Sequence, residues 1–158
     1  MSYQPRHYTT RLMWGVAERL ANAHTILGLP APLAVFDPRL QPYPKGVRGV
    51  YFDHSPTGAD AETQLTCVIT PYLPQSGDLQ VEHTRVQLRA RHPGLGALQV
   101  RDWLDDVRAL FPDKTPMEIG GLLFDRVRIT GSTSWGEPSA TDALETTQNL
   151  TFRGNRYD

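Results

Sequence analysis

The chain has 158 residues, enough for one domain whose core covers roughly two-thirds of the unfolded surface. Its 16 basic and 17 acidic residues give a formal net charge of -1, which argues against a dedicated nucleic-acid binder, since such domains usually carry a clear basic excess. The single cysteine, Cys67, excludes an internal disulfide and lies in an apolar run, so we expect a buried, reduced thiol. We therefore expect one domain over residues 1–158, in which any basic function is local.

The N-terminal segment MSYQPRHYTT lacks the apolar centre of a signal peptide. No apolar run along the chain approaches the ~20 residues that a membrane-spanning helix needs. We accordingly expect a protein that folds in the cytoplasm and does not associate with membranes.

The first predicted element is a helix over about residues 10–27. Apolar residues recur there at helical spacing, Thr9 or Thr10 can cap the N-terminus, and Gly28 can end the helix. Trp14 falls well away from the apolar stripe of this helix. Either a loop or another subunit must then cover its indole, and tryptophan is enriched at protein interfaces.

A proline-rich excursion follows over residues 29–60, with room for short strands only near 33–36 and 49–52. We expect its long loops to project from the domain. Two longer strands come next, in TQLTCVITPYL and LQVEHTRVQLRAR, and the turn PQSGD suits a hairpin between them. The apolar phase of the second strand slips, which predicts a bulge or twist near His83.

Helical spacing returns in HPGLGALQVRDWLDDVRALFP, where Pro112 ends the helix and where Asp102 and Asp105 lie opposite the apolar face. Two further strands are predicted in LLFDRVRITGSTSW and ALETTQNLTFRGNRY. The order of helix, strands, helix and strands predicts an α+β fold. We expect a mainly antiparallel sheet with two helices packed on one face, and a long proline-rich loop.

No motif in the chain supports catalysis or metal binding. The five histidines lack metal-ligand spacing, and neither a phosphate-binding glycine loop nor a nucleophile elbow occurs. Asp102, Asp105 and Asp106 are candidate acid–base carboxylates, but they project onto an exposed helix face near Arg101 and Arg108. A solvated surface is the better interpretation, so we expect no enzyme, no metal and no cofactor.

Three predicted strands place arginine opposite their apolar residues, namely Arg85, Arg89, Arg91, Arg126, Arg128 and Arg153. Such arginines can simply solubilise an open sheet face, bind the phosphates of DNA or another anion, or pair with carboxylates of a neighbouring subunit. We favour pairing with Asp102 and Asp105 of a neighbour, because a chain near neutrality can complement itself around a ring.

The chain resembles the tail terminator proteins of long-tailed bacteriophages, often called minor tail or minor capsid proteins. The resemblance covers about residues 10–156 and is carried by the first helix, the strand VQLRAR, the helix VRDWLDDVRALF and the closing SWGEPSATDALETTQNLTFRGNR. Of the family's usual approach to the last strand only Asp142 is kept here, and the proline-rich segment matches only as a long excursion.

The resemblance implies a structural virion protein at the tail–neck junction, assembled in the host cytoplasm. Such proteins form a ring of six on the last ring of the tail tube, stop its polymerisation and provide the surface that joins the head. The implied partners are further copies of the chain, the tail tube protein, a head-completion or neck protein and the tape-measure protein, with genomic DNA passing through the lumen. Another head–tail neck component and a small anion-binding domain are the alternatives.

Site residues follow from these expectations. The candidates for contacts between subunits are Arg85, Arg89, Arg91, Arg153, Asp102, Asp105 and Trp14. Arg126 and Arg128 are candidates for either the lumen or the interface. The candidates for contact with the tube or the head lie in the proline-rich segment and are Arg39, Tyr43, Lys45 and Arg48.

Overall fold

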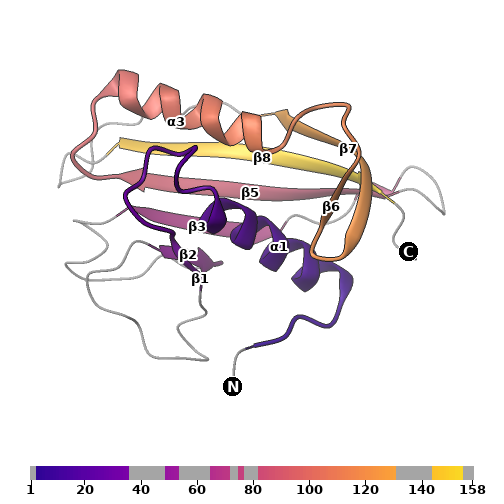
Figure 1. Ribbon diagram of the computed structural model, residues 1–158. Coiled ribbons are helices and arrows are strands. Elements are labelled where there is room, and N and C mark those ends of the chain that lie inside the picture. The colour runs from indigo at the N-terminus through magenta and orange to yellow at the C-terminus, as the bar shows by residue number, and fades with distance from the viewer. Residues whose placement is uncertain are drawn as a thin grey trace.

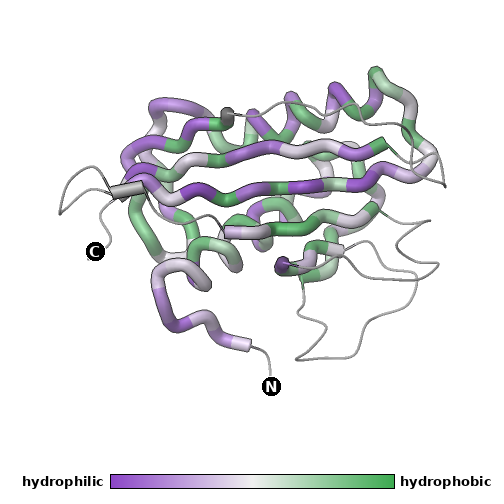
Figure 2. The backbone as a smooth tube through the Cα atoms, turned by 180° about the vertical axis from the view of Figure 1, so that it is seen from behind, coloured by the Kyte–Doolittle hydropathy of each residue, from purple (hydrophilic) through white to green (hydrophobic). Residues whose placement is uncertain are grey.

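Two helices and one mixed sheet make up the part of the chain that the computed structural model describes, which is residues 3–35, 49–53, 65–71, 75–76, 82–130 and 144–154. The elements are α1 (Tyr8–Asn22), β1 (Ala34–Val35), β2 (Gly49–Phe52), β3 (Thr66–Pro71), β4 (Gln75–Ser76), β5 (Glu82–His92), α3 (Ala97–Leu110), β6 (Met117–Ile119), β7 (Leu122–Thr130) and β8 (Leu144–Gly154). Both helices lie on the same face of the sheet (Figures 1 and 2).

The strands run in the order β1-β2-β3-β5-β8-β7-β6, and β4 adds to β5. β1, β2 and β3 are parallel to one another, whereas every other pairing is antiparallel. The α+β fold with two helices on one face of a mainly antiparallel sheet is therefore confirmed. The predicted hairpin partners are also confirmed, because β3 pairs antiparallel with β5.

The core lies between the two helices and the sheet face that they cover. β5 and β8 pair along their whole lengths, from Glu82 opposite Gly154 to His92 opposite Leu144. In both strands every second side chain is buried, as expected for strands with one covered face. Each helix contributes a buried apolar stripe, from Leu12 to Leu20 in α1 and from Val100 to Leu110 in α3. The buried stripe predicted for α3 is therefore confirmed.

The first helix is shorter than predicted. It starts after His7, whose backbone N–H donates to the Thr10 hydroxyl at 3.3 Å, and it ends at Asn22 instead of residue 27. Residues 23–28 form turns that bury Leu27, and Gly28 adopts a positive φ of 68°. The helix ends here because Asn22, His24 and Thr25 are weak helix formers. Burial of Leu27 in the turn is then more favourable than a longer helix.

On the edge that faces β3 and β4, the register of β5 shifts by one residue between Val86 and His83, where a bulge or twist is predicted. The register of β5 against β8 is continuous through His83, whereas β7 shifts register between Phe124 and Arg126. The extra residue lets both Phe124 and Val127 be buried although they are three positions apart. The strand β6, inside a segment that reads as turns, was not predicted.

Close contacts fix α1 on the sheet and on α3. The backbone of Gly15 lies against Gly120 in the β6–β7 turn, where a Cβ atom on Gly15 would overlap the Gly120 nitrogen. From the same helix Arg11 donates to the Gly120 carbonyl at 3.1 Å. Later in α1, Arg19 donates to the Leu110 carbonyl at 2.7 Å, at the C-terminal end of α3. These contacts hold both helices in one layer.

A group of buried polar side chains lies beneath α3. His92 Nε2 is 3.0 Å from the Thr146 hydroxyl, and the His92 ring meets the Trp103 ring edge-on, with centroids 5.3 Å apart. Gln148 donates to the Leu104 carbonyl at 3.3 Å and so links β8 to the helix. Burial lowers the pKa of His92 to about 4, so its imidazole is neutral at pH 7.

We expect the free energy of unfolding to fall as the pH drops from about 6.5 to about 4. In this range His92 is protonated in the unfolded state but still neutral in the folded state, because its pKa is lowered by burial. The loss attributable to this residue is at most about 3 kcal/mol and levels off below pH ~4. Urea denaturation across this range checks it, with His92→Phe as the variant that cannot titrate. Identical pH profiles of the two proteins would contradict the prediction.

Candidate functional site

The six predicted outward arginines share the sheet face opposite the helices, and we call this surface the arginine face. It consists of Arg85, Arg89 and Arg91 in β5, Arg126 and Arg128 in β7, and Arg153 in β8. The strand register brings them together: Arg85 and Arg128 both lie opposite Thr151, and Arg126 lies opposite Arg153. The outward placement predicted from the alternation in three strands is thereby confirmed.

Three of the six guanidinium groups are ion-paired within the chain. Arg91 contacts Glu145 at 3.1 Å, Arg126 contacts Asp113 at 3.1 Å, and Arg153 contacts Asp125 at 3.8 Å. The hydrogen bond from Arg126 lowers the pKa of Asp113. All three pairs are partly exposed to solvent, and such pairs contribute little to stability, typically below about 1 kcal/mol. Sequence reasoning assigned Arg91 and Arg153 to a neighbouring subunit and missed these local partners.

The other three arginines have no ion-pair partner among the residues that the structure describes. Arg85, Arg89 and Arg128 are exposed, and each presents a planar set of donors that matches a carboxylate or a phosphate. Gln87 and Asn149 lie between them in the register and hydrogen-bond to one another at 3.2 Å. The centre of the arginine face therefore offers unsatisfied positive charge on a rigid sheet.

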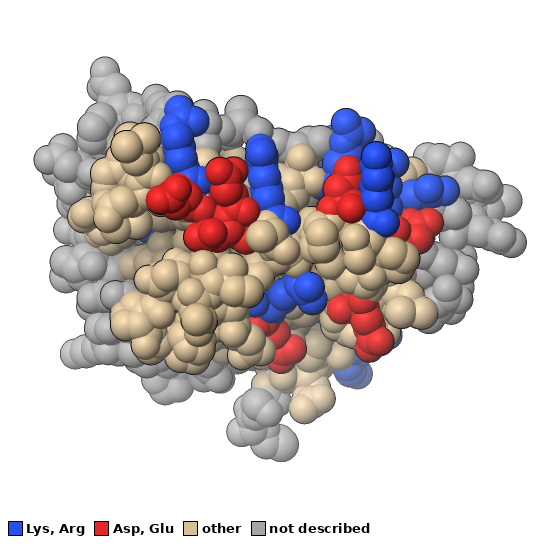
Figure 3. Space-filling model, turned by 45° about the horizontal axis from the view of Figure 1, so that its top comes forward, with Lys and Arg blue, Asp and Glu red and all other residues tan. Residues whose placement is uncertain are grey.

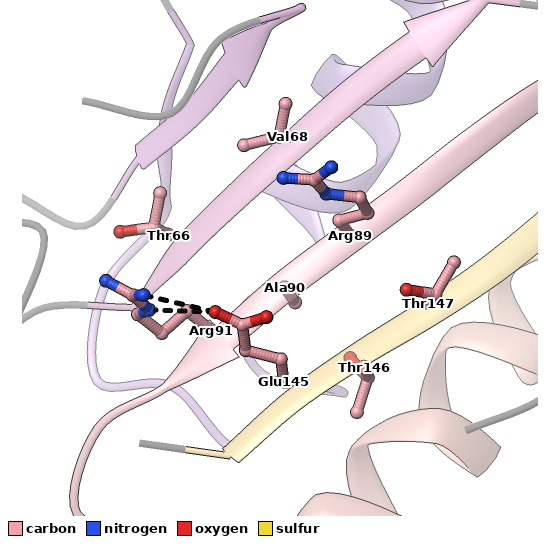
Figure 4. Close-up of a pocket in the computed structure, with 8 residues that line it drawn as sticks. All are labelled: Thr66, Val68, Arg89, Ala90, Arg91, Glu145, Thr146 and Thr147. Carbon is pink, nitrogen blue, oxygen red and sulfur yellow. Dashed lines mark hydrogen bonds and ion pairs between the residues drawn. The ribbon is translucent and has the colours of Figure 1, made fainter. Parts of the chain in front are cut away.

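A shallow pocket of about 140 Å³ opens on this face where β3, β5 and β8 meet (Figure 4). The side chains of Arg89 and Arg91 rise from β5, with Thr66 and Val68 on one side and Glu145 and Thr147 on the other. Arg91 donates from both Nε and Nη2 to the same Glu145 oxygen, at 3.2 and 3.1 Å. Arg89 is thus the cation of the pocket that is open to an incoming anion.

The carboxylates predicted to pair with the arginines lie on the opposite side of the molecule, on α3. Asp102 and Asp105 are exposed on α3, as predicted, and neither is ion-paired with a described residue. Burial raises the pKa of the neighbouring Asp106, and the charges of Asp102 and Asp105 raise it further. Figure 3, in which the α3 side comes forward, shows acidic groups gathered between basic ones on this side. The sheet thus separates the free arginines from these aspartates.

Trp14 is partly covered by its own chain. Its indole stacks on Phe52 of β2, with centroids 5.5 Å apart and planes 14° apart, and it meets Tyr3 edge-on at 5.5 Å. Its Nε1–H donates to Glu18 at 2.8 Å, so its polar atom is satisfied within α1. The sequence left open whether a loop of the chain or another subunit covers Trp14. Contacts within the chain cover a large part of the side chain.

The described residues form neither a reactive thiol nor a metal site. Cys67 is fully buried, and burial raises the pKa of its thiol to about 12, which leaves it protonated at neutral pH. No three histidine, cysteine, aspartate or glutamate side chains within the described ranges gather in a way that could hold a metal ion. The predicted loop contacts Arg39, Tyr43, Lys45 and Arg48 lie outside those ranges.

Comparisons with known proteins show no relative of this chain. No protein-family model matches the chain, and a search of curated proteins finds no matching sequence. Neither α1 nor α3 is long and apolar enough to cross a lipid bilayer.

Replacing Arg85, Arg89 and Arg128 with glutamine should leave the folded monomer intact. Because these side chains are exposed and unpaired, the free energy of unfolding should change by less than about 0.5 kcal/mol per site. Leu88→Ala, on the covered side of the same strand, should instead cost about 2–4 kcal/mol. Chemical denaturation at high salt and low protein concentration measures both. A large loss in the glutamine variant would mark the arginines as structural.

Proposed function

We propose that the chain is a structural subunit that assembles into a ring, with the arginine face of one copy against the α3 side of the next. The observation that carries this proposal is the position of Arg85, Arg89 and Arg128 on one side of the sheet and of Asp102 and Asp105 on the other. Complementary patches on opposite sides of a subunit produce head-to-tail contacts, and such contacts form closed rings when the rotation closes.

We further propose that this ring is the tail terminator of a long-tailed bacteriophage, a cap of six copies on the tail tube. Its support is the order of the segments that carry the resemblance, which fold here as α1, β5, α3 and β8. A terminator must fit the last tube ring on one side and deny a matching edge to the next ring. Its partners would be the tube protein, the tape-measure protein and a head-completion protein.

A small anion-binding domain is the second candidate, and one observation favours it. The pocket around Arg89 contains a guanidinium without an ion-pair partner in the described part of the chain, beside the hydroxyl of Thr147. Phosphate binding that alanine at Arg89 abolishes, in a protein that stays monomeric, would favour this candidate over the ring.

Arg89→Glu should impair self-association while leaving the monomer folded. Reversing one charge replaces attraction with repulsion at the proposed contact, so we expect association at least about tenfold weaker, and stronger association of the wild type at low salt. Sedimentation velocity and native mass spectrometry measure both effects. Arg6→Glu is the matched control, because Arg6 is exposed outside the arginine face. Partial recovery by adding Asp105→Arg would identify the partner, whereas normal assembly of Arg89→Glu contradicts the contact.

The terminator role is tested in the phage that encodes the chain. If its gene is silenced, electron microscopy should show overlong tails that are not attached to filled heads, because tube growth no longer stops. Tails of normal length that lack heads would point to another neck component. Unaffected particles would contradict a role in the tail altogether.

A further inference from the structure

Two arginines and a threonine form a row across the middle of the arginine face, and we call it the Thr151 row. Thr151 of β8 lies opposite Arg85 of β5 on one side and opposite Arg128 of β7 on the other. Leu150 and Phe152 are buried, so the Thr151 side chain points to the arginine face. Neighbouring strands are about 4.8 Å apart, which puts the Cα atoms of the two arginines roughly 10 Å apart, on either side of Thr151.

The carboxylates nearest to this row are already paired with other arginines. Arg126 and Arg153 lie opposite one another beside the row, and they contact Asp113 and Asp125 respectively. The two arginines of the Thr151 row are exposed and have no ion-pair partner among the described residues. The row therefore keeps two positive charges for a group that comes from outside.

An amide pair borders the other side of the row. Gln87 of β5 lies opposite Asn149 of β8, and Gln87 Nε2 donates to Asn149 Oδ1 at 3.2 Å. Because this oxygen is engaged, Asn149 can offer its Nδ2 group as a donor. Asn149 is two positions before Thr151 in β8, so both side chains project from the same face. A group above Thr151 thus meets donors from both neighbouring strands and from β8 itself.

Such an arrangement suits a phosphate group better than a carboxylate. A carboxylate has two oxygens in one plane, and the paired donors of a single guanidinium can satisfy both. A phosphate with three free oxygens can accept from Arg85, Arg128 and the Thr151 hydroxyl at the same time. A phosphodiester has two free oxygens and a single charge, so it would leave part of the row unused.

We propose that the Thr151 row binds the phosphate group of a monoester or of free phosphate, and that this group competes with the carboxylates of the next copy. The site itself does not require the ring. The competition rests on the proposed contact between copies, because Arg85 and Arg128 belong to that contact. Arg89 of the shallow pocket is four positions from Arg85 along β5, or about 13 Å, so the two are separate places for an anion.

The site is tested by NMR titration of the ¹⁵N-labelled full chain with inorganic phosphate at neutral pH, while sodium chloride holds the ionic strength constant. The chain carries Asp102→Asn and Asp105→Asn, which removes the α3 side of the proposed contact and leaves the arginine face intact. The backbone amide signals of Arg85, Arg128 and Thr151 should move in a saturable way at millimolar phosphate.

Variants and phosphate esters define the site further. Arg85→Gln should weaken phosphate binding about tenfold, and Thr151→Val should weaken it several-fold. Arg89→Gln is the matched control, an exposed arginine on the same strand, and should change the affinity by less than about twofold because the distance is beyond the range of screened charges. Dimethyl phosphate, a diester, should bind about tenfold more weakly. Methyl phosphate should bind like inorganic phosphate if the site accepts the group on a larger molecule, and much more weakly if its ligand is the free ion.

Sedimentation velocity of the wild type tests the competition. Self-association should be weaker in phosphate than in sodium chloride of the same ionic strength. A wild type that is monomeric in both salts would overturn the contact between copies, and the competition with it, but not the phosphate site. Self-association that saturating phosphate leaves unchanged would overturn the competition alone.

Two outcomes of the titration would overturn the site. Equal phosphate binding with and without Arg85→Gln would reduce the effect to general screening of the arginine face. Equal binding of dimethyl phosphate and inorganic phosphate would make the row a contact for a nucleic-acid backbone instead.

Discussion

The pairing of β5 with β8 over eleven consecutive residue positions is the constraint on which the rest of the structure depends. Side chains alternate strictly across such a pair, so once the helices cover one face, every other residue of both strands must point to the opposite face. Val86, Leu88, Leu150 and Phe152 take the covered side. The arginines of β5 have no alternative to the open side, and the basic surface is thus a consequence of register.

The unpaired arginines and the exposed aspartates of α3 lie on opposite sides of the sheet. The ion pairs of the arginine face are exposed and contribute little, so they do not explain why the sheet carries so many guanidinium groups. The sheet itself prevents Arg85, Arg89 and Arg128 from reaching Asp102 and Asp105 of the same chain. A subunit with unpaired arginines on one side of its sheet and exposed aspartates, lying among basic side chains, on the other is suited to repeated contacts with its own kind, which underlies the proposed ring.

The layer between α3 and the sheet is less well satisfied than the rest of the core. His92, Thr146 and Gln148 bring polar groups beneath the helix, while Trp103 adds an indole N–H without a partner in the described structure. A neutral histidine is compatible with this environment and a charged one is not, because nothing described there neutralises it. The same layer borders a pocket that His92 and Trp103 line together with Asp106, so the least satisfied part of the core lies close to the surface.

Local residue patterns predict the strand alternation, the buried face of α3 and the outward arginines correctly, because these depend on periods of 2 and 3.6 residues that any one segment displays. The local pattern misplaced the end of α1 and missed both β6 and the bulge in β7. Burial of Phe124 with Val127, and of Leu27 in a turn, depends on neighbours distant in the chain. The folded chain reveals which arginines are already paired, that Trp14 stacks on Phe52, and that Asp102, Asp106, His92 and Trp103 line one pocket. Such contacts join residues far apart in sequence, where local pattern carries no information.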